Sequence, residues 1–272
     1  MSTITWVQPE SLDELRAALR DGARLHGGGT GLMRNPPARG SIADLSLLGI
    51  DGARANGTSI QAGGAASIAT VVRETGRVEP GHIVVQALSR MAAPALRNRI
   101  TLGGSVALFP PWSSVVGPLL AAGTRLTLVG AHEATVGLEE YLERRQLRRG
   151  TAIVDIEIAL TPGLRSSWFA FTRTRFTYPL FAVAVAGRCE RAALTELRVV
   201  VTGSTGRYTR LWELEERLVG SAIPPELSAD DPAVRIPTRQ GYSGDYLTRL
   251  ATIQIRRGIA LIASADPDEA VT

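Results

Sequence analysis

The sequence predicts an α+β fold, and the order of its strand and helix patterns carries that prediction. Over the first 160 residues these patterns follow one another without a regular strand–helix–strand repeat. Three strand patterns then come in succession, at 168–174, 180–186 and 194–201. Helical patterns follow them. Such an order is typical of α+β proteins rather than of regular βαβ folds. With 272 residues, 44% of them hydrophobic, the chain can form a large core and more than one domain.

Capping residues and glycines delimit the elements of the first part. Ser11 and Glu14 form a capping box that opens a helix, and Gly22 ends it. Ser67 caps a second helix, which Gly76 closes. The hydrophobic patterns predict further strands at 23–26, 41–45, 59–63, 125–129, 133–136 and 154–160, and further helices at 82–91, 119–122 and 138–149. Residues 100–107 are interpreted as a glycine-broken strand.

The last part of the chain follows a Thr-Pro-Gly linker at 161–163. Besides the three strands, it contains two helical patterns, at 209–218 and 243–262. The segment between them, 220–236, is rich in proline and acidic residues and is expected to be irregular.

The composition excludes several kinds of chemistry. All 30 basic residues are arginine, so a lysine Schiff base, a P-loop lysine and a lysine general base are ruled out. Cys189 is the single cysteine and the three histidines are far apart, so no metal site is expected. The arginines are interspersed with 26 acidic residues, which argues against nucleic-acid binding. With neither a signal pattern nor a membrane-spanning apolar run, the chain is expected to be cytoplasmic.

Two glycine-rich segments are the candidates for ligand binding. The first is Leu-His-Gly-Gly-Gly-Thr-Gly-Leu at 25–32, and the second is Arg-Asn-Arg-Ile-Thr-Leu-Gly-Gly-Ser at 97–105. Glycines allow successive backbone N–H groups to approach an anion, so two such loops suit a pyrophosphate. The first loop has neither the Rossmann spacing nor a P-loop lysine. Taken singly, each loop is also compatible with a tight turn between strands. No Ser-His-Asp or paired-carboxylate pattern accompanies them, which argues against hydrolysis.

Five segments together resemble the FAD-binding medium subunit of the molybdenum hydroxylases, the group of xanthine dehydrogenase and aerobic carbon monoxide dehydrogenase. The most specific match is Leu96-Arg97-Asn98 with Thr101-Leu102-Gly103-Gly104, which resembles the family's Ile-Arg-Asn and Thr-Ile-Gly-Gly hallmark. The first loop resembles its Ala-Gly-Gly-Thr-Asp-Leu segment. Residues 42–45 resemble the family's Ile-Asp-Leu strand, residues 59–64 its following Ile-Gly-Ala segment, and residues 169–185 the start of its C-terminal domain. With weaker matches at 197–220 and 246–257, the resemblance covers essentially the whole chain.

The resemblance implies a vanillyl-alcohol-oxidase (PCMH)-type FAD-binding fold. Two FAD-binding subdomains would occupy residues 1–55 and 56–162, and a C-terminal domain with an antiparallel sheet and helices would occupy 163–272. The FAD pyrophosphate would lie on the two glycine loops, with an apolar residue near the flavin ring. The implied cofactor-binding positions are Arg24, Leu25, His26, Gly27, Gly28, Gly29, Thr30, Gly31, Leu32, Thr101, Gly103, Gly104, Ser105, Ser113, Ser114, Ile153, Thr172 and Arg173.

Several of these positions depart from the family pattern. Ser105 stands in place of an asparagine, Ser114 in place of an aspartate, and Gly31 in place of an acidic or polar residue. Thr172 occupies the position of a lysine that the family often places near the flavin, with Arg173 beside it. The flavin environment is therefore expected to differ from that of the family.

The implied function is electron transfer within a molybdenum hydroxylase complex. An iron–sulfur subunit carrying [2Fe-2S] clusters and a molybdopterin subunit would be the partners, and NAD, a quinone or oxygen would be the acceptor. The lack of cysteine ligands in this chain agrees with clusters on another subunit. Two alternatives remain open: a stand-alone FAD-dependent oxidoreductase or oxidative cyclase acting on a small molecule, and a scaffold subunit that has lost FAD.

Overall fold

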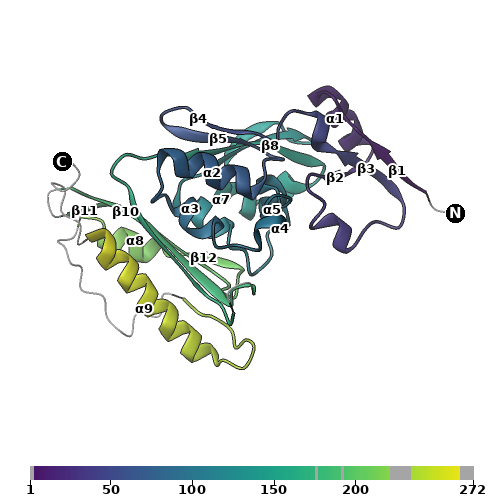
Figure 1. Ribbon diagram of the computed structural model, residues 1–272. Coiled ribbons are helices and arrows are strands. Elements are labelled where there is room, and N and C mark those ends of the chain that lie inside the picture. The colour runs from purple at the N-terminus through teal and green to yellow at the C-terminus, as the bar shows by residue number, and fades with distance from the viewer. Residues whose placement is uncertain (1–2, 175–176, 191–192, 221–233, 264–272) are drawn as a thin grey trace. The chain divides into compact units, whose positions relative to one another are not determined.

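The computed structural model describes residues 3–174, 177–190, 193–220 and 234–263 (Figure 1). Contacts between residues divide the chain into two units. The first unit consists of residues 1–80, 92–109 and 123–160, and the second of residues 81–91, 110–122 and 161–272. The division into domains at 55/56 and 162/163 stays a prediction.

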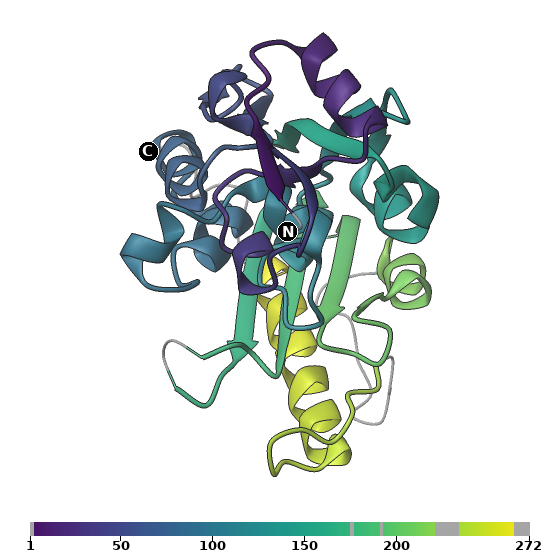
Figure 2. The same cartoon turned by 90° about the vertical axis from the view of Figure 1, so that its right-hand side faces the viewer.

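A small parallel sheet begins the first unit. Its order is β1-β3-β2, with β1 (Ile4–Val7), β2 (Arg24–His26) and β3 (Gly40–Asp44). Helix α1 (Leu12–Arg20) connects β1 to β2, as Figure 2 shows for the purple segment. The Ser11 cap is confirmed, because its hydroxyl accepts a hydrogen bond from the N–H of Glu14, but the Glu14 side chain accepts from the N–H of Glu10 rather than from that of Ser11. Two short 3₁₀ turns, η1 (Leu32–Arg34) and η2 (Leu45–Leu47), follow β2 and β3.

A five-stranded antiparallel sheet forms the rest of the first unit. Its order is β4-β5-β8-β6-β7, with β4 (Ala53–Ala55), β5 (Ser59–Gly63), β6 (Arg125–Gly130), β7 (Ala134–Gly137) and β8 (Thr151–Ala159). Helices α2 (Ile68–Val78) and α5 (Leu102–Leu108) contact β5 (Figure 1). The remaining elements of this unit are α4 (Pro94–Arg97), α7 (Leu138–Glu143) and η3 (Arg145–Arg148). Along β8, Ile156 and Ile158 are buried while Asp155 and Glu157 are partly exposed, which is the alternation of a half-buried strand.

The second unit is built on a four-stranded antiparallel sheet of order β12-β11-β10-β9. The strands are β9 (Arg165–Phe171), β10 (Phe181–Glu190), β11 (Ala193–Thr202) and β12 (Tyr208–Arg210). The helices are α3 (Ile83–Leu88), α6 (Val116–Ala121), α8 (Trp212–Leu218) and α9 (Gly244–Ala263). Helix α9, yellow in Figure 2, runs along β9 and β10.

Both faces of β10 are covered by helices. Val183 and Val185 belong to the same core cluster as Ile255 and Ile259 of α9. On the opposite face, Ala184 lies beside Gly117 of α6, where an added Cβ would be 3.7 Å from the alanine Cβ. Helices on both sides explain why residues 181–187 form a continuous buried run.

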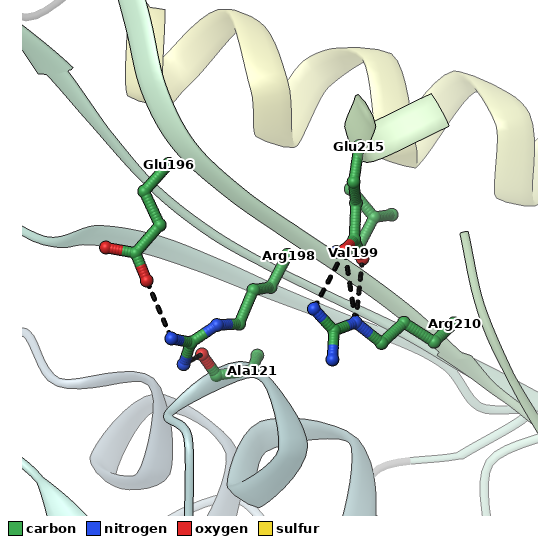
Figure 3. Close-up of polar contacts among 6 residues, drawn as sticks. All are labelled: Ala121, Glu196, Arg198, Val199, Arg210 and Glu215. Carbon is green, nitrogen blue, oxygen red and sulfur yellow. Dashed lines mark hydrogen bonds and ion pairs between the residues drawn. The ribbon is translucent and has the colours of Figure 1, made fainter. Parts of the chain in front are cut away.

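A buried carboxylate joins α8 to β11 and β12 (Figure 3). Glu215 accepts hydrogen bonds from the backbone N–H of Val199 at 2.8 Å and from Nη2 of Arg210 at 2.9 Å. Beside it, Arg198 donates from Nη1 to the carbonyl oxygen of Ala121, the last residue of α6, at 3.2 Å (Figure 3). These contacts tie α6 and α8 to the sheet.

The α+β class and most of the elements are as predicted, with one important correction. The predicted strand at 100–107 is wrong, because this segment contains helix α5. Thr101 caps that helix by accepting a hydrogen bond from the N–H of Gly104 at 3.2 Å. Gly103 is buried against Gly64, where a side chain would clash, so its glycine reflects packing rather than a strand break.

Smaller corrections concern where elements end. The helix predicted over 138–149 ends at Glu143 and continues as the 3₁₀ turn η3, and residues 208–210 form a strand before α8. Strand β9 ends at Phe171, so Thr172 and Arg173 lie just after it. Most of the segment predicted to be irregular, 220–236, lies outside the described residues.

Candidate cofactor-binding site

The first glycine loop leaves the carboxyl end of a parallel strand. It follows His26, the last residue of β2, which is in register with Asp44 at the end of β3. Ligand sites of parallel sheets commonly lie beyond this edge. Gly29 adopts a φ of +73°, a left-handed conformation that favours glycine, and the loop then enters η1.

The backbone of this loop offers hydrogen-bond donors that the protein does not use. The N–H groups of residues 27 to 31 donate to no acceptor in the described part of the chain. Backbone N–H groups that have no acceptor within the protein normally bind a solvent or ligand molecule instead. Consecutive donors of this kind in a glycine-rich turn can bind the oxygens of a phosphate.

The second loop lies directly against the first. A Cβ on Gly28 would overlap the carbonyl oxygen of Arg99, and a Cβ on Gly27 would lie 3.0 Å from Oγ1 of Thr101. Arg99 in turn donates from Nη2 to the carbonyl oxygen of Gly28, at 3.4 Å. The two loops are therefore in direct contact, and the contact requires glycine in the first loop.

The donors of the second loop are occupied by the protein. Leu102 donates its N–H to the carbonyl oxygen of Ala66 at 2.8 Å, and Gly103 donates to that of Gly64 at 3.0 Å. The N–H of Gly104 is bound by the Thr101 side chain. The second loop thus fixes the position of the first, while the first loop supplies free N–H groups. Gly104 is exposed at the start of α5, so it remains a candidate contact.

Two further predicted positions lie beside the second loop. Ser105 donates its hydroxyl to the carbonyl oxygen of Thr101 at 2.8 Å, so this side chain has a partner within its own helix. Ile153 is buried in β8, and its carbonyl oxygen is so close to Gly64 that a Cβ there would overlap it. Because Gly64 also contacts Gly103, Ile153 belongs to the same neighbourhood as the second loop.

The positions around the first loop have different environments. Arg24 is exposed, whereas Leu25 packs against the hydrophobic cluster that contains Leu15 and Leu19 of α1. Thr30 and Leu32 are half-buried. Leu25 is therefore held by packing, and the free N–H groups begin two residues after it.

Four predicted positions belong to the second unit. Ser113 is buried, and its hydroxyl oxygen accepts hydrogen bonds from Val115 at 3.2 Å and Val116 at 3.3 Å, which caps the start of α6. Ser114 and Thr172 are half-buried and Arg173 is exposed. Their role in cofactor binding stays a prediction.

Sequence reasoning did not identify Gly64 and Arg99 as parts of the site. Gly64 touches both Gly103 and Ile153, and the carbonyl oxygen of Arg99 closes the first loop. The signal for Gly64 was present, because it ends the Ala-Gly-Gly segment that resembles the family. Arg99 carries no such signal, since its backbone rather than its side-chain type makes the closest contact.

Comparison with known proteins identifies the family. The family described as FAD binding domain in molybdopterin dehydrogenase matches residues 2–160, and the chain belongs to this family. The predicted resemblance and the FAD-binding class are thereby confirmed. No curated protein sequence matches the chain.

Solved structures show the same fold over almost the whole chain. A carbon monoxide dehydrogenase from Hydrogenophaga pseudoflava that lacks the Mo-pyranopterin moiety has 20% sequence identity and a TM-score of 0.84, covering 94% of this chain and 96% of that one. Quinoline 2-oxidoreductase from Pseudomonas putida 86 has 19% identity and a TM-score of 0.82, with coverage of 96% and 97%. A reconstituted carbon monoxide dehydrogenase from Oligotropha carboxidovorans has 19% identity and a TM-score of 0.82, with coverage of 97% and 99%.

The described helices include none that is long and apolar enough to cross a membrane. The predicted cytoplasmic location stays a prediction.

Proposed function

We propose that this chain binds FAD at the first glycine loop and acts as the electron-transfer flavoprotein subunit of a molybdenum hydroxylase complex. The observation that carries the proposal is the run of free N–H groups at residues 27–31, in a chain that belongs to an FAD-binding family. The carbon monoxide dehydrogenase and quinoline 2-oxidoreductase of the same fold are oxidoreductases, which supports the same class of reaction here.

The residues of the first unit fit a dinucleotide cofactor. A pyrophosphate carries its charge on oxygens, and the backbone N–H groups of the first loop would bind these oxygens. The second loop holds that backbone in place through Arg99 and Thr101. When bound, FAD supplies the redox centre of the subunit, and the protein binds and orients it.

In the complex, electrons would come from an iron–sulfur subunit that is itself supplied by a molybdopterin subunit. The [2Fe-2S] clusters and the molybdenum cofactor would lie on those partners, because groups of three or more metal-ligating side chains are absent from the described residues of this chain. NAD, a quinone or oxygen would be the final acceptor.

A titration of the purified chain with FAD tests the proposal. We expect quenching of flavin fluorescence, together with a visible flavin spectrum that stays with the protein through gel filtration. Absence of binding would contradict the flavoprotein assignment and favour a scaffold that has lost FAD. Turnover of a small molecule by the FAD-loaded chain alone would instead favour the stand-alone oxidoreductase. Co-purification with iron–sulfur and molybdopterin subunits would support the electron-transfer role.

A further inference from the structure

The imidazole of His26 lies next to the first glycine loop. A Cβ on Gly29 would be 2.6 Å from Nε2 of His26, so this nitrogen is adjacent to the loop backbone. The ring is edge-on to Trp6, with centroids 5.1 Å apart and an interplanar angle of 75°. These contacts from the loop and from β1 fix the ring at the edge of the predicted pyrophosphate site.

The other ring nitrogen faces a carboxylate. Nδ1 of His26 is 3.7 Å from Oδ1 of Asp44, and the two side chains are 18% and 20% exposed. This distance is too long for a hydrogen bond, and the buried Nδ1 has no hydrogen-bond partner in the described structure. Asp44 is itself held in place, because the same oxygen accepts a hydrogen bond from the N–H of Ser46 at 3.0 Å.

The charges around this ring are of two kinds. Trp6, which approaches from β1, is uncharged. Asp44 on β3 is an acidic side chain, and its Oδ1 faces Nδ1 of the ring at 3.7 Å. Arg99 is a basic side chain that donates from Nη2 to the carbonyl oxygen of Gly28 in the loop. An anion bound at the loop would therefore place negative charge on both sides of the ring.

We propose that FAD binding is coupled to proton uptake by His26. This inference rests on the proposed function and deepens it. In the bound state the protonated ring donates Nε2–H to a pyrophosphate oxygen, and its Nδ1–H faces the Asp44 carboxylate. The proton comes from solvent. The pyrophosphate of FAD is a diester and does not titrate near neutral pH, so the uptake is assigned to the protein.

Isothermal titration calorimetry of the full chain with FAD tests this coupling. The measurement is made at one pH near neutrality, in two buffers with different ionisation enthalpies. The difference in observed binding enthalpy gives the number of protons taken up. We expect uptake of a fraction of a proton, at most one, by the unmodified chain. This arm needs no variant, so a folding defect cannot obscure it.

Variants locate the proton. His26→Gln keeps a neutral polar side chain, so we expect it to abolish the uptake and to raise the Kd for FAD about tenfold or more, as for loss of a hydrogen bond to a charged group. Asp44→Asn should reduce the uptake without removing the ring. His132→Gln, on the turn between β6 and β7, is the matched control and should leave both quantities unchanged.

The outcomes separate the two proposals. If the unmodified chain does not bind FAD, the proposed function fails, and this inference fails with it. If the chain binds FAD with no dependence of the enthalpy on buffer, or if His26→Gln binds and takes up protons as before, only the inference is overturned. Thermal unfolding of each variant without FAD identifies any change that reflects loss of the fold.

Discussion

Leu108 lies against Gly31. Its Cδ2 atom is 3.3 Å from the position that a Cβ on Gly31 would take. In the family pattern that the sequence resembles, Gly31 stands in place of an acidic or polar residue, and Leu108 stands in place of the asparagine that begins an Asn-Ala-Ser-Pro segment. Because the two residues are in contact, the two departures are connected: an acidic side chain at 31 would meet an apolar one at 108.

This contact predicts that substitutions at the two positions are coupled. Gly31 has a φ of −93°, so Gly31→Asp needs no left-handed backbone and its main conflict is with Leu108. Leu108 is 60% exposed, so Leu108→Asn alone should cost little stability. In a double-mutant cycle on thermal stability and FAD affinity, we expect a favourable coupling of about 0.5 kcal/mol or more. Additive effects would mean that the contact does not connect the two departures.

A side chain at Gly28 should disrupt the meeting of the two loops. Its Cβ would overlap the carbonyl oxygen of Arg99, which is backbone and cannot rotate away. For Gly28→Ala we expect a loss of about 1–3 kcal/mol in the free energy of unfolding, as for other overpacked sites, and a weaker affinity for FAD. Gly52→Ala is the control, because its Cβ would meet no atom within 4 Å. Equal stability of the two variants would contradict the loop contact.

These relationships show what sequence reasoning could and could not supply. The glycine loops, the Ser11 and Ser67 helix caps and the order of the strands follow from local patterns. The pairs Gly28–Arg99, Gly31–Leu108 and Gly103–Gly64 are separated by many residues, so these contacts exist only in the folded chain. For that reason the local pattern alone indicates a glycine-broken strand at 100–107, whereas Gly103 lets helix α5 pack against Gly64. The N–H groups of the first loop are free and those of the second loop are bound, and only the tertiary hydrogen bonds of the folded chain show this difference.

The side chain of Gln86 should stabilise the second unit by joining α3 to the edge strand β9. Its Nε2 donates to the carbonyl oxygens of Gly81 at 2.8 Å and Ser166 at 3.0 Å, and its Oε1 accepts from the N–H of Trp168 at 3.1 Å. Gln86→Ala would leave these groups without this partner, so we expect a loss of about 1–3 kcal/mol in chemical denaturation. Gln146→Ala, at an exposed site, is the control. A Gln86→Ala protein as stable as the control would show that solvent replaces the amide.

Removal of the Glu215 carboxylate should cost more. Glu215 is 4% exposed and accepts from both Arg210 and the N–H of Val199, so Glu215→Ala removes the carboxylate from a partly buried guanidinium and from a buried N–H (Figure 3). We expect a loss of about 3–5 kcal/mol in the free energy of unfolding, as for other broken buried pairs. Glu216→Ala, exposed on the same helix, should change it little. Similar losses for the two variants would contradict the role assigned to the buried carboxylate.

Asp155 should make the stability of the chain depend on pH. Burial in β8, reinforced by the nearby Glu157 carboxylate and opposed by Arg54, raises the pKa of Asp155 above its ordinary value. For a carboxyl whose pKa is raised on folding, the folded state favours the protonated form, so stability falls as pH rises from the ordinary pKa through the raised one.

The variant Asp155→Asn tests this pH dependence, because it mimics the protonated side chain and escapes the loss of stability. Its unfolding free energy should match that of the unmodified chain in acid, exceed it increasingly over that interval, and then keep a constant advantage. Denaturant unfolding across the acid range measures this difference, with the exposed Asp51→Asn as control. If Asp155→Asn is less stable at neutral pH, the ionised carboxylate makes a favourable contact and the predicted sign is wrong.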